Sequence, residues 1–271
     1  MGLDLNKLKA RLNAMNEKGS TRASLWKPKE KAVIRIVPYI FNKDNPFIEL
    51  YFHYGMNNKT YLSPSSYGRP DPIVELATKL KRSGDKEDYK QGKNLDPKMR
   101  VYVPVLVRGE ESEGVKFWGF GKQVYQELLA IIADDDYGDI TDLGKGRDVT
   151  VEFKTKEQTG KDFPETSVRV KPNSSPAFDP NDKALLEKYK NQKDIKEIFP
   201  EPTYADLEAV LEKWLGSASA EETAAESATV EASEDVPVEK KAEVKKTPAD
   251  KGKVASQDDI AAQFDDLFAG K

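Results

Sequence analysis

Six short runs of alternating or β-branched apolar residues, each bounded by turn residues, constrain the fold of this chain most. Short strands separated by turns are typical of a compact β-barrel or β-sandwich rather than of alternating strands and helices. Helical spacing of apolar residues predicts four helices inserted among these strands. We therefore expect a mainly β fold with inserted helices. The expected strands are residues 31–40, 47–54, 101–108, 115–120, 148–154 and 166–170, and the expected helices are residues 72–82, 122–133, 181–191 and 203–215.

The two ends of the chain differ from this central part. Apolar residues recur at helical spacing over residues 4–17, which predicts a short amphipathic helix before the basic link KGSTR. After Leu215 the chain has no aromatic and almost no large apolar residue until its last segment, so it cannot offset the entropy of ordering. We therefore expect an N-terminal arm (1–22), a folded core (23–215) and a disordered acidic tail (216–271).

The last segment, DDIAAQFDDLFAGK, restores apolar residues among acidic ones. An amphipathic segment after a flexible spacer is typical of an element that docks on a partner protein. A frayed end without a role is the alternative. The residues expected to dock are Ile260, Phe264, Leu267 and Phe268.

The formal net charge of -4 conceals an uneven distribution. Residues 1–133 carry a net charge of +8, whereas residues 134–215 and residues 216–271 carry -6 each. A basic first part and an acidic last part indicate a portion that binds a polyanion and a tail that can compete with it. Ordinary drift of charge along a sequence is the alternative interpretation.

Several kinds of chemistry are excluded by residue type. The chain has no cysteine and a single histidine, His53, which excludes disulfides, thiolate metal sites and most histidine-based catalysis. GFGKQV lacks the spacing of a Walker phosphate loop, and ADDDYGD lacks that of a calcium-binding EF-hand. We therefore predict that the protein is not an enzyme. No apolar run approaches the ~18 residues of a membrane span, so we expect a cytoplasmic protein without membrane contact.

Basic residues are interleaved with aromatic residues between positions 54 and 125, and this mixture indicates which kind of ligand the protein binds. A single strand of nucleic acid presents unstacked bases and phosphates. Aromatic rings stack on bases at roughly 1 to 3 kcal/mol each, without regard to sequence. Lysines and arginines bind the phosphates in a salt-sensitive way. Each such residue alone is more often structural, so the prediction depends on the cluster.

The stretch VKFWGFGKQVY, residues 115–125, has an aromatic residue on both faces of an expected strand. Alternation places Val115 and Phe117 on one face, and Lys116 and Trp118 on the other. A face that mixes lysine with tryptophan is awkward to bury. From this stretch alone, an amphipathic strand with Trp118 packed under a loop is favoured over a ligand-binding surface.

Four landmarks in order resemble the gene-32-type single-stranded DNA-binding (helix-destabilising) proteins of T-even-type bacteriophages. They are KAVIRIVP, then NPFIELYFHYG with KTYL, then VYVPVLV with EGVKFWGFGKQVYQELLAII, and SPAFD after VRVKPNSS, over most of residues 4–172. The resemblance implies an oligonucleotide-binding (OB) fold β-barrel core whose cleft holds single-stranded DNA. It also implies sequence-independent, cooperative binding during phage DNA replication, recombination and repair, in the cytoplasm of an infected bacterial host cell.

The resemblance also implies roles for parts of the chain. The N-terminal arm would dock on the neighbouring protomer, with Lys18, Ser20, Thr21 and Arg22 as the nearest match to the family's cooperative motif. The acidic tail would recruit phage replication and recombination proteins. With the basic–aromatic cluster, the resemblance gives these nucleic-acid-binding candidates: Arg35, Tyr61, Tyr67, Tyr89, Lys93, Lys98, Arg100, Tyr102, Lys116, Trp118, Lys122 and Phe163. Trp118 falls on a cleft position of the family, which favours the stacking face for Trp118 and the core for Phe117.

The chain departs from the family at the zinc site, which in the phage prototype has one histidine and three cysteines. Because the cysteines are missing here, we predict no zinc and no other cofactor. We expect apolar packing of Ile73, Val74, Leu76 and Leu80 to hold this subdomain instead.

Two other functions stay open. One is an OB-fold RNA-binding or chaperone protein, since stacking does not distinguish RNA from DNA. The other is a non-catalytic phage scaffold or loader protein.

Overall fold

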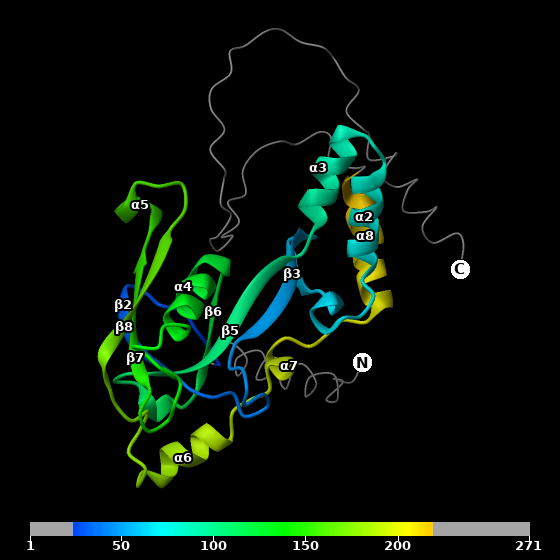
Figure 1. Cartoon of the computed structure of the whole chain (residues 1–271). Coiled ribbons are helices and arrows are strands. Elements are labelled where there is room, and N and C mark those ends of the chain that lie inside the picture. Colours follow the sequence, from blue (N-terminus) through cyan, green and yellow to red (C-terminus); the bar gives the residue numbers. More distant parts are fainter. Residues whose placement is uncertain (1–23, 219–271) are drawn as a thin grey trace, which may run out of the picture. The chain divides into compact units, whose positions relative to one another are not determined.

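The computed structural model describes residues 24–218 (Figure 1). These residues form two compact units rather than one core. The sheet unit comprises residues 24–49 and 100–200, and the helical unit comprises residues 50–99 and 201–218. The N-terminal arm and nearly all of the acidic tail lie outside the described residues. In the described part of the chain, no helix has the length and apolar character needed to cross a bilayer.

The sheet unit is built on strands in the order β1-β6-β5-β2-β7-β8. The bounds are β1 Leu25–Trp26, β2 Lys31–Ile36, β5 Lys98–Val107, β6 Lys116–Phe120, β7 Arg147–Lys154 and β8 Glu165–Ser174. Neighbours pair antiparallel except β1 and β6, which are parallel. The prediction of a mainly β fold with inserted helices is confirmed. Within residues 24–218 no strand pairing joins β8 back to β1, so the sheet is open and the expected closed OB-fold barrel is not confirmed.

The core of the sheet unit follows from alternation along β2, β5 and β7. Ile34 of β2 lies opposite Val107 of β5 on one side and Val149 of β7 on the other. Directly opposed residues in an antiparallel pair point to the same face, so one face collects the branched side chains. Ile34 and Val149 have no exposed surface. This buried face fixes the register of the strands that carry the candidate site.

Three short helices connect the strands of the sheet unit: η2 Glu111–Glu113, α4 Lys122–Ile132 and α5 Lys156–Thr159. Two more, α6 Lys183–Lys190 and α7 Ile195–Ile198, follow the last strand, β8. The helices expected at 122–133 and 181–191 are α4 and α6. The single turn α5 lies at the tip of the β7–β8 ribbon (Figure 1). Thr155 and Gln158 close its first turn as a capping box, and Gly160 ends it in the left-handed region at φ 64°. The tip of this ribbon is therefore an ordered turn.

The helical unit packs three helices around one apolar cluster. Its elements are β3 Ile48–Met56 (its first two residues in the sheet unit), β4 Lys59–Leu62, η1 Pro64–Tyr67, α2 Pro72–Arg82, α3 Lys86–Leu95 and α8 Tyr204–Ala218. Asn57 and Asn58 connect β3 to β4 with φ of 51° and 56°, the left-handed geometry of a tight hairpin turn. Helix α8 continues past the expected end at residue 215.

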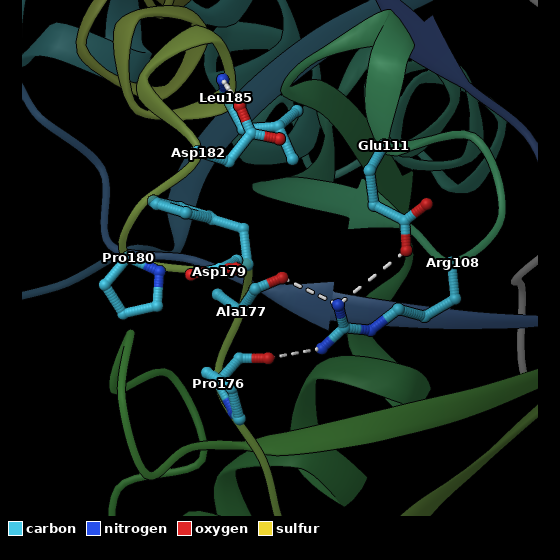
Figure 2. A pocket seen from close by; sticks show the side chains of 9 residues that line it. Arg108, Glu111, Pro176, Ala177, Asp179, Pro180, Asp182 and Leu185 are labelled. Atoms are coloured by element: carbon cyan, nitrogen blue, oxygen red, sulfur yellow. Dashed lines mark hydrogen bonds and ion pairs between the residues drawn. The ribbon is translucent and has the colours of Figure 1, made fainter.

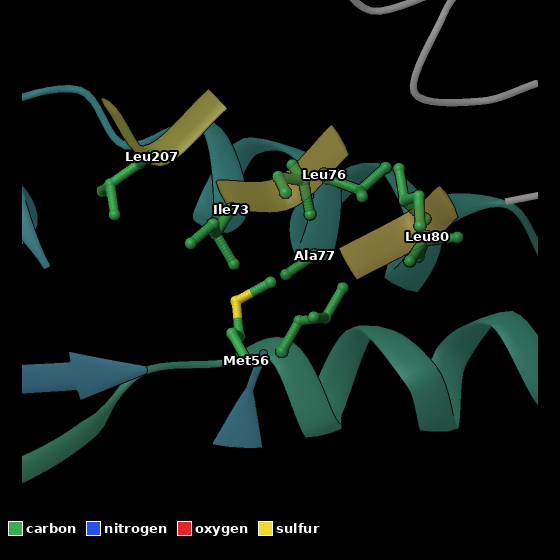
Figure 3. Close-up of a cluster of buried hydrophobic side chains, with 9 residues drawn as sticks. Met56, Ile73, Leu76, Ala77, Leu80 and Leu207 are labelled. Carbon is green, nitrogen blue, oxygen red and sulfur yellow. The ribbon is translucent and has the colours of Figure 1, made fainter. Parts of the chain in front are cut away.

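The apolar cluster confirms the expected packing for three of four residues (Figure 3). Ile73, Leu76 and Leu80 recur at helical spacing on α2 and have no exposed surface. Val74 lies off this face and is only half-buried, so its expected place in the cluster is wrong. The other members come from β3, α2, α3 and α8: Met56, Ala77, Leu95, Leu207, Leu211 and Leu215.

Candidate nucleic-acid interface

Trp118 is a core residue of the sheet unit. It lies on β6 opposite Val103 of β5, and the two therefore share a face. Val103 has no exposed surface and Trp118 is 1% exposed. Trp26 meets the Trp118 ring edge-on with ring centroids 6.0 Å apart, and Phe120 packs at 4.5 Å. The structure therefore places Trp118 in the core and not on an exposed stacking face, and Phe117 on the other face of β6 lies in the core as expected, also 1% exposed.

Lys116 shares the face of Trp118 and its charge is neutralised locally. Its ammonium group forms ion pairs with Glu113 and with Glu110, the latter at 3.5 Å. Partial burial disfavours the charged form, but the hydrogen bonds and charges of the two glutamates outweigh it and raise the pKa of Lys116. The side chain is 14% exposed. Lys116 is thus occupied within the sheet unit and offers little to a phosphate.

Arg35 is a buried structural residue and not a surface cation. It has no exposed surface, and its Nη2 lies 2.9 Å from Oδ1 of Asp148. Nη1 and Nη2 also donate to the carbonyl oxygen and hydroxyl of Ser175, at 2.7 Å each. Burial lowers the pKa of Arg35, and the charge of Asp148 opposes that shift. The structure does not present Arg35 to a ligand as expected, because the side chain has no exposed surface and its guanidinium group is held by Asp148 and Ser175.

Arg108 shares Asp148 with Arg35 and lines a surface pocket. Its Nη2 lies 2.8 Å from Asp148 Oδ1 and also donates to the carbonyl oxygen of Pro176, while Nη1 donates to that of Ala177 (Figure 2). The pocket is lined by Arg108, Glu111, Pro176, Ala177, Phe178, Asp179, Pro180, Asp182 and Leu185. Three carboxylates outnumber the one arginine there, which disfavours a phosphate.

The opposite face of β5 and β6 carries Arg100 and Tyr102. Both are half-buried. Tyr102 lies opposite Gly119, and a Cβ built on Gly119 would come within 2.5 Å of Cε1 of the Tyr102 ring. The glycine in WGFG therefore leaves room for this ring, which packs on Phe199 with ring centroids 4.8 Å apart. Tyr102 thus presents part of its ring from a fixed position.

Two further candidates of the sheet unit are exposed. Lys122 is the first residue of α4, directly after the N-cap Gly121. Phe163 lies between α5 and β8 with 45% of its surface exposed, and the ammonium nitrogen of Lys156 lies 5.8 Å from its ring centroid. An accessible ring and a neighbouring cation are the two groups that a nucleotide needs for its base and its phosphate.

The helical unit repeats this combination. Tyr89 on α3 is 45% exposed, and Lys93 Nζ lies 5.7 Å from its ring centroid, one helical turn along. Lys98 is exposed at the start of β5. Tyr61 and Tyr67 are half-buried, and Tyr61 packs against the apolar cluster of this unit. The structure therefore makes Tyr89 and Lys93 more accessible than Tyr61 and Tyr67.

Two exposed aromatic residues were not among the sequence candidates. Phe41 in the sheet unit is 54% exposed and Tyr54 in the helical unit is 37% exposed. Tyr54 ends the expected strand 47–54, and Phe41 directly follows the expected strand 31–40. Burial of alternate residues is the only available signal there, and it does not identify which aromatic residue faces outward.

The residues around His53 do not fit a zinc site. His53 is 2% exposed, its Nδ1 lies 3.1 Å from the carbonyl oxygen of Leu95, and its Nε2 lies 2.9 Å from Oδ2 of Asp71. Ser63 also donates to Asp71, which caps α2 through the amide of Ile73. Both imidazole nitrogens are thus engaged by oxygen atoms. A hydrogen-bonded cap joins β3, α2 and the end of α3 at this point.

Comparison with known proteins indicates which kind of molecule these residues bind. No curated protein matches the chain significantly. The family described as gp32 DNA binding protein like matches residues 29–216, well over half of the chain, and this match confirms the resemblance seen in the sequence. The arm candidates Lys18, Ser20, Thr21 and Arg22 and the docking candidates Ile260, Phe264, Leu267 and Phe268 lie outside the described residues. The chain belongs to the gp32-like family of DNA-binding proteins.

Proposed function

We propose that the protein binds single-stranded DNA, without catalysis and without a strong sequence preference. The observation that carries this proposal is the pairing of exposed aromatic rings with lysines in a gp32-like DNA-binding domain. Phe163 with Lys156 and Tyr89 with Lys93 provide one such pair in each unit. A ring can stack on any base, and a nearby ammonium group can neutralise the adjacent phosphate.

Further residues add to each unit. In the sheet unit, Arg100, Tyr102 and Lys122 supply two cations and a partly exposed ring. In the helical unit, Lys98 supplies a cation. Each stacked base contributes roughly 1 to 3 kcal/mol, and each neutralised phosphate adds a salt-dependent contribution. Trp118, Arg35 and Lys116 are excluded from the proposed set because burial and internal ion pairs occupy them.

Finer features of the proposal rest on the family resemblance. The core would be an OB-type barrel, and binding would be cooperative through the N-terminal arm (1–22). The acidic tail (216–271) would recruit proteins of phage DNA replication, recombination and repair in the cytoplasm of the infected host. Folding and DNA binding would require no zinc, because His53 is the chain's single histidine and both of its ring nitrogens face oxygen atoms. Metal analysis of the purified full-length protein tests the last point, and stoichiometric zinc that resists mild chelation would contradict it.

Substitution of the exposed rings tests the central proposal. Phe163→Ala and Tyr89→Ala should each weaken binding of a fluorescent oligothymidine by roughly 1 to 3 kcal/mol. Leu129→Ala is the matched control, because Leu129 is a 41% exposed apolar residue on α4 that has no aromatic ring. Circular dichroism melting should be unchanged in all three variants. Equal affinities of the two ring variants and the wild type would contradict stacking at these positions.

The choice of nucleic acid is tested with the same assay. Matched single-stranded DNA, single-stranded RNA and duplex DNA are titrated over a salt series. Paired bases hide their faces, so we expect much weaker binding to the duplex. Duplex binding equal to single-strand binding would contradict the proposal. Tighter binding to the RNA strand would instead favour the RNA-binding alternative.

A further inference from the structure

Phe41 is the most exposed large apolar side chain of the described residues, at 54%. It lies in the turn between β2 and β3, where Tyr39 and Asn42 form an isolated β-bridge and the amide of Asn42 donates to the carbonyl oxygen of Tyr39 at 3.1 Å. A phenylalanine in this turn is not required by the turn itself, since the bridge uses backbone atoms only. The ring contributes little to the core from this position.

The turn that carries Phe41 is nevertheless held firmly. Tyr39 is 4% exposed, and its hydroxyl donates to Asp194 Oδ1 at 2.9 Å and accepts from the amide of Ile195 at 3.0 Å. Gln192 donates from Nε2 to the carbonyl oxygen of Pro38 at 3.1 Å. A segment more than 150 residues further along the chain thus fixes the backbone on the N-terminal side of Phe41.

Aromatic contacts extend from Phe41 into the sheet unit. The Phe41 ring lies 5.4 Å from that of Tyr39, and Tyr39 meets Phe117 of β6 edge-on at 5.9 Å. Phe117 shares a face of β6 with Gly119, next to which the Tyr102 ring lies. Phe41 is therefore the exposed end of a row of three aromatic rings that reaches Phe117, a residue on the face of β6 that also carries Gly119.

We propose that Phe41 is an additional stacking site for an unpaired nucleobase. This inference rests on the proposed function and extends it to a residue outside the sequence candidates. A ring that is supported from behind, fixed by a hydrogen-bonded turn and open on its outer side loses little freedom when a base stacks on it. Lys43, two residues further on, is exposed and can reach the phosphate of the same nucleotide, although the neighbouring Asp44 weakens that attraction.

Tryptophan fluorescence provides a direct test in the full-length protein. Phe41→Trp places a reporter at the proposed site, and oligothymidine should quench its added emission through stacking. Leu129→Trp is the matched control at an exposed position of the same unit, and its added emission should not change. Three native tryptophans, the buried Trp26 and Trp118 and the partly buried Trp214, contribute the same background to both variants.

Affinity measurements complete the test. Phe41→Ala should weaken oligothymidine binding at least about fivefold, the lower limit for one stacked base, with unchanged thermal melting. Phe41→Leu should show the same loss, because it keeps an apolar group but has no ring. Unchanged affinity of both variants, or equal quenching of the two tryptophan reporters, would overturn the inference. If wild-type protein binds oligothymidine but the Phe41 variants are unaffected, only the added site is wrong; absence of wild-type binding would instead contradict the proposed function.

Discussion

Replacement of Trp118 by alanine distinguishes a core role from a binding role. The side chain is 1% exposed and contacts Trp26 and Phe120. A buried aromatic side chain removes about 150 to 250 Å² from water, which at about 25 cal/mol per Å² corresponds to about 4 to 6 kcal/mol as an upper limit. Substitutions of this kind cost about 3 to 5 kcal/mol. We expect Trp118→Ala to lower the free energy of unfolding by that amount.

Urea unfolding followed by circular dichroism measures this loss. Trp118→Phe serves as the milder variant, because a phenyl ring keeps most of the buried contact and should cost only about 1 to 2 kcal/mol. The affinity of folded Trp118→Phe protein for oligothymidine should equal that of the wild type. A stable Trp118→Ala protein with a tenfold or greater loss of affinity would refute the reasoning, since it would place the indole ring on the DNA.

Three further substitutions follow from contacts within the units. Arg35→Ala should lower the free energy of unfolding, measured in urea, by about 3 kcal/mol, because Asp148 loses one of its two guanidinium partners. The affinity of this variant for oligothymidine should stay within about twofold of the wild-type value. Gly119→Ala should displace the Tyr102 ring, so titration with oligothymidine should show weaker binding, and an unchanged affinity would remove Tyr102 from the site. Burial opposes ionisation of Asp71, but its hydrogen bonds outweigh burial and lower its pKa. The stabilisation from ionised Asp71 is therefore complete above about pH 4 and is lost as the pH falls through the pKa of the folded state. Asp71→Asn should therefore flatten the acid side of a plot of melting temperature against pH.

The strands and most helices could be predicted because their signals are local. Period-two and 3.6-residue patterns identified β2, β5, β7, α2 and α4 with bounds close to those observed. Helix α3 was missed, because KEDYKQGKNL is strongly polar and buries only a few residues. Gly92 lets α3 approach α2 closely, since a Cβ there would lie 2.6 Å from the carbonyl oxygen of Ala77. That close approach is a tertiary property and has no periodic signature.

The candidate site was harder to predict than the fold, because exposure depends on which face of a strand turns inward. For β6 both faces carry aromatic residues, and the structure buries both, with Phe117 and Trp118 each 1% exposed, which an alternating pattern does not predict. Arg35 was chosen for its charge, but its carboxylate partner lies 113 residues away in sequence. Phe163 and Tyr89, by contrast, lie in polar surroundings where an aromatic residue has no core to join, and the structure places both at the surface.

The most direct test of the account compares an oligothymidine strand with an abasic strand of the same length and charge, over a salt series. Both ligands present the same phosphates, so the difference in their affinities isolates the contribution of the bases. If the exposed rings stack on at least two bases, oligothymidine should bind at least about 30-fold more tightly, and the two salt slopes should be similar. Equal affinities for the two strands would contradict the account, because binding would then depend on charge alone.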